Sequence, residues 1–125
     1  MKKIKYKKLV LDYENILKKF PNAVKKLEEY FSAREDIMEG MKQIGHDPKE
    51  SEAALTHFVG MIIQFDPRKL VDAFDYYGIF TNVVRADGEH WTYFVTDSPH
   101  SYSAEDRIEG EIAVFMEAMD VLNKI

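Results

Sequence analysis

The sequence predicts an α+β fold, a predominantly helical single domain with one antiparallel β-hairpin packed on helices. Most of the chain repeats apolar residues at spacings of three and four, which is typical of amphipathic helices. The segment at about 79–96 instead combines β-branched and aromatic residues around Asp87-Gly88, the pattern of a tight hairpin. A length of 125 residues fits one domain over 1–125.

The first two helices are expected at residues 6–19 and about 22–43. Pro21 separates them, because the residue before a proline is disfavoured in the α region. The second helix has a long apolar stripe opposite a charged face. The first has its own stripe, and we therefore expect the lysine-rich N-terminal segment to be part of the fold. That stripe consists of Leu9, Tyr13, Ile16, Leu17 and Phe20.

Two further helices are expected at about 48–64 and 67–77. Asp47-Pro48 and Asp66-Pro67 each place an N-capping carboxylate before a proline at the first helical position. Gly45 and Gly78 are expected to end the helices that precede them. Three glycines fall inside helices, where glycine is unfavourable, so each is interpreted as permitting a close helix crossing. They are Gly40, Gly60 and Gly110.

In the hairpin, a two-residue turn at Asp87-Gly88 predicts a register with Val84 opposite Trp91 and Asn82 opposite Tyr93. Side chains alternate between the faces of a strand, so the register also predicts which of them face the core. We expect Trp91 to be a core residue. The complete predicted core face is Phe80, Val84, Trp91, Tyr93 and Val95.

The last helix is expected to open with a capping box, Ser103 to Asp106. It carries one apolar stripe of Ile108, Ile112, Phe115, Met119 and Leu122. A second apolar stripe consists of Val114, Ala118, Val121 and Ile125. Two stripes require two neighbours, either two elements of the same fold or one element and a second subunit. The second stripe is therefore a candidate homodimer interface, and the hairpin edge is the other.

Signs of chemistry are few. Without cysteine the chain has no disulfide, thiolate metal site or cysteine nucleophile, and no nucleotide-binding or hydrolase motif occurs. The densest polar cluster combines Asp97, His100 and Asp106, which could hold a divalent cation, while Ser98 or Ser101 could pair with His100 as nucleophile and base. Neither has the spacing of a known site. We therefore predict no catalytic residue, metal or cofactor.

The charge is divided along the chain. The net charge is −5, yet residues 1–26 hold nine lysines against two carboxylates, while the remainder holds 8 basic and 20 acidic residues. The sequence favours a small non-enzymatic cytoplasmic domain that acts through protein–protein contact, as a homodimer or with another protein partner. The longest apolar runs are short, such as Val59–Ile63, so we expect no membrane span.

An alternative is a nucleic-acid-associated regulator. The order helix, corner, helix, hairpin over about 48–96 resembles a winged-helix module, which implies DNA binding by the hairpin together with the basic N-terminal arm. However, the helix that would enter the groove contains Asp66, Arg68, Lys69, Asp72 and Asp75, a net charge of −1. Phosphates repel such a surface, so this alternative ranks second.

Overall fold

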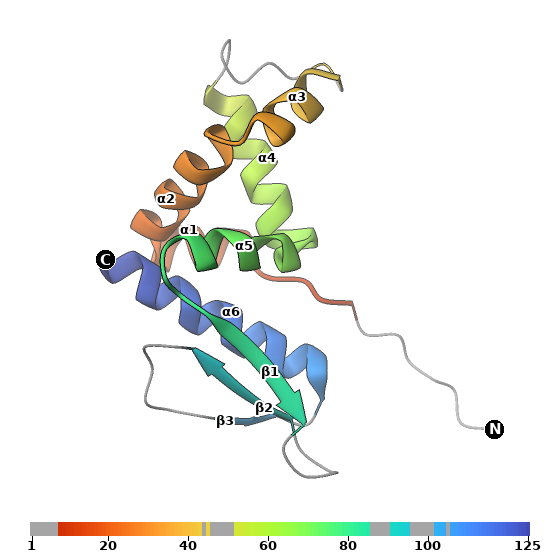
Figure 1. Ribbon diagram of the computed structural model, residues 1–125, viewed down its shortest axis with the longest axis vertical. Coiled ribbons are helices and arrows are strands. Elements are labelled where there is room, and N and C mark those ends of the chain that lie inside the picture. The colour runs from red at the N-terminus through yellow and green to blue at the C-terminus, as the bar shows by residue number, and fades with distance from the viewer. Residues whose placement is uncertain (1–7, 44, 46–51, 86–90, 96–101, 105) are drawn as a thin grey trace, which may run out of the picture.

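Six α-helices and a small antiparallel sheet form the part of the chain that the computed structural model describes, residues 8–43, 45, 52–85, 91–95, 102–104 and 106–125 (Figure 1). The predicted fold class, predominantly helical α+β with a hairpin, is confirmed. In chain order the elements are α1 (Tyr13–Lys19), α2 (Pro21–Ser32), α3 (Glu35–Gln43), α4 (Glu52–Phe65), the 3₁₀ turn η1 (Pro67–Lys69), α5 (Leu70–Tyr76), β1 (Thr81–Arg85), β2 (Trp91–Val95), β3 (Tyr102–Ala104) and α6 (Arg107–Lys124).

Helix α6 lies between the two layers of the fold, with α2 on one side and the sheet on the other (Figure 1). Both of its predicted neighbours therefore belong to the same chain. Val114 and Ala118 are buried, and Val121 packs against the core from a partly buried position. Val114 and Ala118 are thus not available at the surface, although the homodimer interpretation of this stripe requires them there. Ile125 is the exposed member.

The first helix begins later than predicted. Asp12 is its N-cap and accepts a hydrogen bond from the backbone N–H of Asn15 at 3.2 Å. The preceding residues are not helical, because the N–H of Leu11 donates to the carbonyl of Gln64 in α4 at 3.1 Å. Leu9 and Leu11 are nevertheless buried. The prediction that this segment is part of the fold is therefore confirmed by Leu9 and Ile16, whereas Leu17 of the predicted stripe is 42% exposed. Residues 6 and 7 lie outside the described part.

The second predicted helix is in fact two, α2 and α3, which are separated at Ala33 and Arg34. The Arg34 side chain binds the Asp36 carboxylate at 2.8 and 3.1 Å and the Tyr30 hydroxyl at 2.9 Å across this break. The N-cap residue of α2, Phe20, has no side-chain hydrogen-bond acceptor, so a residue far along the chain caps this helix. Asn123 Oδ1 in α6 accepts from the N–H groups of the second and third residues of α2 at 2.9 and 3.2 Å.

The ends of the helices agree more closely with the sequence prediction than their beginnings do. Gly45 and Gly78 have φ angles of +88° and +78°, the left-handed region that glycine favours at helix ends. Pro67 occupies the first turn as predicted, although the Asp66 side chain does not cap it and instead pairs with Lys69 Nζ at 3.1 Å. Asp47-Pro48 lies outside the described residues.

The hairpin register differs from the prediction by one residue. Arg85 is opposite Trp91, and Val83 is opposite Tyr93. The turn itself, including Asp87-Gly88, lies outside the described residues. A shift by one residue exchanges the two faces of a strand. The predicted core side is thus correct for Tyr93 and Val95 on β2. It is wrong for β1, where Val83 faces the core and Val84 faces the other side of the sheet. The same inversion buries Ile79 and leaves Phe80 55% exposed.

A third strand, β3, was not predicted. It pairs with β2, so the sheet order is β1-β2-β3. The predicted capping box is wrong, because Ser103 belongs to this strand and Asp106 alone caps α6, accepting from the N–H of Glu109 at 2.8 Å. Trp91 is only partly buried, and the Arg107 guanidinium lies 5.9 Å from its ring centroid. The prediction that Trp91 is a core residue is therefore wrong.

Gly60 in α4 permits a close contact with Tyr13 of α1, as its position inside a helix predicts. A Cβ at Gly60 would lie 2.9 Å from Cε1 of Tyr13, whereas a Cβ at Gly40 would meet nothing within 4 Å. Both alanine substitutions gain helix propensity, about 1 kcal/mol. Only Gly60→Ala forces a steric displacement, which typically costs about 1–3 kcal/mol. In urea unfolding, the Gly40→Ala variant is thus expected to have a free energy of unfolding about 1–3 kcal/mol higher than that of Gly60→Ala. Equal values for the two variants would show that the Tyr13 ring moves aside without cost.

Candidate functional site

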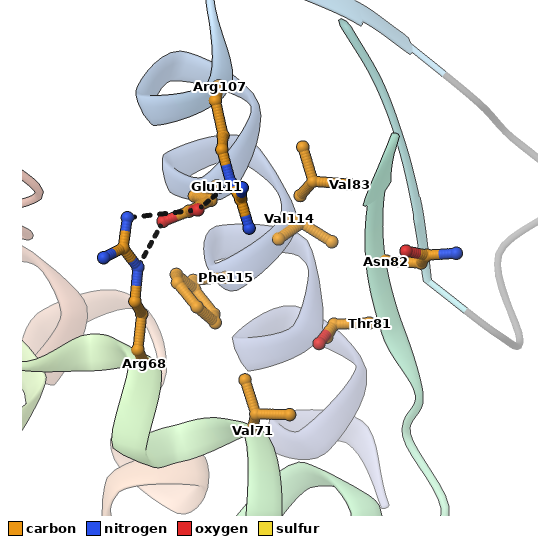
Figure 2. A pocket seen from close by; sticks show the side chains of 9 residues that line it. All are labelled: Arg68, Val71, Thr81, Asn82, Val83, Arg107, Glu111, Val114 and Phe115. Carbon is orange, nitrogen blue, oxygen red and sulfur yellow. Dashed lines mark hydrogen bonds and ion pairs between the residues drawn. The ribbon is translucent and has the colours of Figure 1, made fainter. Parts of the chain in front are cut away.

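A pocket of about 300 Å³ lies between β1, α6 and the corner formed by η1 and α5 (Figure 2). Its wall is apolar, with Val71, Val83, Val114 and Phe115. Its polar side chains include two arginines and a glutamate. The complete lining is Arg68, Val71, Thr81, Asn82, Val83, Arg107, Glu111, Val114 and Phe115. The pocket thus combines an apolar wall with a charged rim, the usual composition of a binding site.

The carboxylate of Glu111 is buried and is held by two guanidinium groups. Only 7% of its side chain is exposed. Arg68 donates from Nε to Oε2 at 3.0 Å and from Nη2 to Oε1 at 3.3 Å, while Arg107 donates from Nε to Oε1 at 2.9 Å. Burial of a carboxylate is costly unless it is paired and hydrogen-bonded, and both conditions are met here. The three side chains together carry a charge of +1.

Local structure places each of these groups. Arg107 and Glu111 are four residues apart in α6, so their side chains meet on one face of the helix. Arg68 comes from η1, whose direction is determined by the corner at Pro67. The Phe74 and Phe115 rings stack at 6.4 Å with an interplanar angle of 22° and join α5 to α6. Packing in the core therefore holds the two arginines in their relative positions.

Arg107 has hydrogen-bond donors that Glu111 does not use. Its Nε binds Glu111, and its guanidinium lies over the Trp91 ring. Within the part of the chain that the structure describes, its two Nη groups make no further hydrogen bond. Figure 2 shows the guanidinium extending toward Val83 and Val114. With 62% of the Arg107 side chain and 59% of the Arg68 side chain exposed, an anion can approach without displacing Glu111.

From the sheet, the pocket is lined by β1 alone. β1 is at one end of the sheet order, and no other strand of the described residues pairs with its outer side. Edge strands present unpaired backbone N–H and C=O groups that can pair with another chain. In Figure 2 the side chains of Thr81 and Val83 point toward α6, whereas Asn82 points away. Among the described residues, the pocket thus adjoins the outer edge of the sheet.

A second cavity, of about 480 Å³, lies beside α1 and α4. Met61 and Phe65 expose their side chains there. Tyr13 lines it, and its hydroxyl is buried with no hydrogen-bond partner among the described residues. Burial, followed by the negative charge of Glu28, raises the pKa of Tyr13 above its ordinary value. This cavity is largely apolar and brings together no cluster of charged groups.

The polar cluster predicted from the sequence is not the site found here. Asp97 and His100 lie outside the described residues, and Asp106 caps α6. The described residues contain no group of three or more histidines and carboxylates positioned for a metal ion. Sequence reasoning missed Arg68, Arg107 and Glu111. The available signal was Glu111 itself, an acidic residue among apolar positions of the last helix.

Glu111→Gln tests whether this carboxylate stabilises the fold. The amide preserves size but removes the charge that offsets two guanidiniums, so we expect a loss of about 1–3 kcal/mol in urea unfolding. The matched control is Glu109→Gln, an exposed carboxylate in the first turn of the same helix, where the expected loss is below about 1 kcal/mol. Equal small losses in the two variants would contradict a structural role for the ion pairs.

Comparisons with protein-family models, curated proteins and solved structures gave no match. The described helices include none with both the length and the apolar character needed to cross a membrane.

Proposed function

We propose that this chain is a non-enzymatic interaction domain of the cytoplasm that acts through protein–protein contact. The observation that carries the proposal is the sheet: α6 covers one of its faces, whereas Phe94 on the opposite face is 42% exposed. Phe80, just before β1, exposes its ring as well. Exposed aromatic side chains are typical of protein contact sites.

A second copy of the chain is the partner we propose for this open face. Two such faces can pack against each other across a two-fold axis, the commonest symmetry of homodimers. The division of charge between residues 1–26 and the remainder also favours attraction between copies. The contact differs from the one predicted on the last helix, because Val114 and Ala118 are used within the chain itself.

Sedimentation velocity at tens of micromolar tests the homodimer. We expect the wild-type chain to sediment at twice 14.6 kDa and Phe94→Ser to sediment as a folded monomer, with unchanged circular dichroism. The matched control is Tyr76→Ser, which removes an aromatic side chain that is 72% exposed but belongs to helix α5 and not to the sheet. A wild-type monomer at these concentrations, or an unaffected dimer in Phe94→Ser, would overturn the proposed pairing.

Nucleic-acid binding is the alternative proposal. The order α4, η1, α5, β1 and β2 reproduces the winged-helix sequence of elements. Asp72 and Asp75 are exposed on α5, and such carboxylates repel phosphates. The hairpin turn and residues 1–7, on which this alternative depends, lie outside the described residues. We therefore rank protein contact first, and a salt-dependent gel shift with duplex DNA would reverse that order.

A further inference from the structure

We propose that the pocket beside β1 binds an acidic, extended segment of a partner protein, which adds to the sheet along β1 and places a carboxylate against Arg107. The proposal rests on the proposed role in protein contact but not on the homodimer, because the pocket and the open face are different surfaces. Three features of the pocket carry it: its charge, its apolar wall and the backbone of the edge strand.

The charge of the pocket selects an anion. Arg107 uses only its Nε toward Glu111, so its two Nη groups remain as positively charged donors at the rim. The Nη groups of Arg107 form a planar fork that matches the two oxygens of a carboxylate. Since the ion pair already fixes the orientation of Arg107, little further side-chain freedom is lost when a ligand binds. The Nη groups of Arg107 are thus oriented to donate hydrogen bonds to a carboxylate of the ligand.

The apolar wall selects a side chain next to that carboxylate. Val71, Val83, Val114 and Phe115 form the apolar part of the lining of this open pocket of about 300 Å³. A cavity of roughly 150 Å³ already holds benzene, so this one accommodates a leucine or phenylalanine side chain. A small inorganic anion would leave this wall in contact with water. The pocket therefore fits a ligand that carries an apolar group as well as a negative charge.

The edge strand gives the spacing between the two groups. In Figure 2 Arg107 lies near Val83 and Val71 lies toward Thr81, two residues away along β1. Side chains two residues apart in a strand point to the same face, about 7 Å from each other. An added strand that pairs with β1 therefore directs an acidic and an apolar residue into the pocket when they are separated by one residue. The expected recognition pattern is acidic-x-apolar or its reverse.

A random heptapeptide library displayed on phage, selected on the full chain, tests this pattern. We expect enrichment of peptides with an acid and an apolar residue at positions i and i+2. A selected peptide is then titrated while the fluorescence of Trp91, the single tryptophan, is recorded, because Arg107 lies over its ring. Replacement of the peptide's acid by its amide is expected to weaken binding about tenfold, the effect of a charge-assisted hydrogen bond.

Variants of the chain locate the contact. Arg107→Gln is expected to bind the acidic peptide and its amide equally, whereas Lys69→Gln, which removes a neighbouring charge that does not line the pocket, keeps the tenfold preference. Circular dichroism confirms folding, and Arg107→Lys, which keeps the charge but not the fork, provides a second variant with a reduced preference. Amide shifts in a ¹⁵N spectrum are expected along β1.

The outcomes separate the two proposals. Equal binding of acid and amide peptides by the wild-type chain, or an unchanged preference in Arg107→Gln, would overturn acidic recognition and leave the interaction function standing. A library that yields no peptide able to shift the β1 amides would overturn strand addition. The proposed homodimer is decided separately by sedimentation, so its failure would be visible independently of the pocket.

Discussion

A chain without residues 1–20 is expected to be largely unfolded at 25 °C. Leu9, Leu11 and Ile16 are buried in the core. Full burial of one such side chain stabilises a fold by about 1.5–3 kcal/mol, so their joint loss amounts to about 5–9 kcal/mol. The stability of a small domain is typically about 5–15 kcal/mol in total. Circular dichroism and urea unfolding of the truncated chain measure this loss directly.

Two further chains control that experiment. Removal of residues 1–7 retains all three buried side chains and tests whether the loss comes from residue 8 onward. Ile16→Ala in the full-length chain isolates one core contact and is expected to cost about 2–5 kcal/mol. A truncation at residue 20 that melts like the wild type would show that the segment does not support the fold, despite its burial.

The helices could be predicted because helical periodicity is a local signal. Leu27 and Phe31 in α2, and Val59 and Ile63 in α4, are buried as their spacing indicates. The break between α2 and α3 could not be found this way, since no glycine or proline marks it. It depends on Arg34, whose partners Tyr30 and Asp36 lie on the two sides of the break.

The sheet was harder to predict because its register depends on one turn. A two-residue loop at Asp87-Gly88 places Val84 opposite Trp91, but the structure places Arg85 there. That single step exchanges the faces of β1, so Val83 packs on the core. β3 carries little pattern of its own, since a three-residue strand is too short to show alternation.

The pocket depends on contacts between distant segments. Arg107 and Glu111 are four residues apart, and a helix brings them together in any fold. Arg68, in η1, is 43 residues from Glu111, and only the tertiary fold makes them partners. Such a contact has no local sequence signal. The polar segment with Asp97, His100 and Asp106 stands out by composition alone, and composition does not determine which side chains meet in the fold.

Phe74→Ala is expected to reduce the free energy of unfolding by about 3–5 kcal/mol, the usual cost of removing a buried aromatic ring. Phe74 is fully buried, and its ring stacks on Phe115. Urea unfolding measures the loss. Tyr76→Ala is the matched control, since it removes an aromatic side chain from the same helix at an exposed position and is expected to cost about 1 kcal/mol or less.

The same substitution connects the core to the pocket. Phe115 forms part of the pocket wall, and without Phe74 its ring loses the partner that holds it in place. We therefore expect Phe74→Leu, which refills most of the space, to recover much of the stability and the peptide binding, whereas Phe74→Ala weakens both. If Phe74→Ala lost stability but bound the selected peptide as tightly as the wild type, the packing of α5 on α6 would not be what positions the pocket.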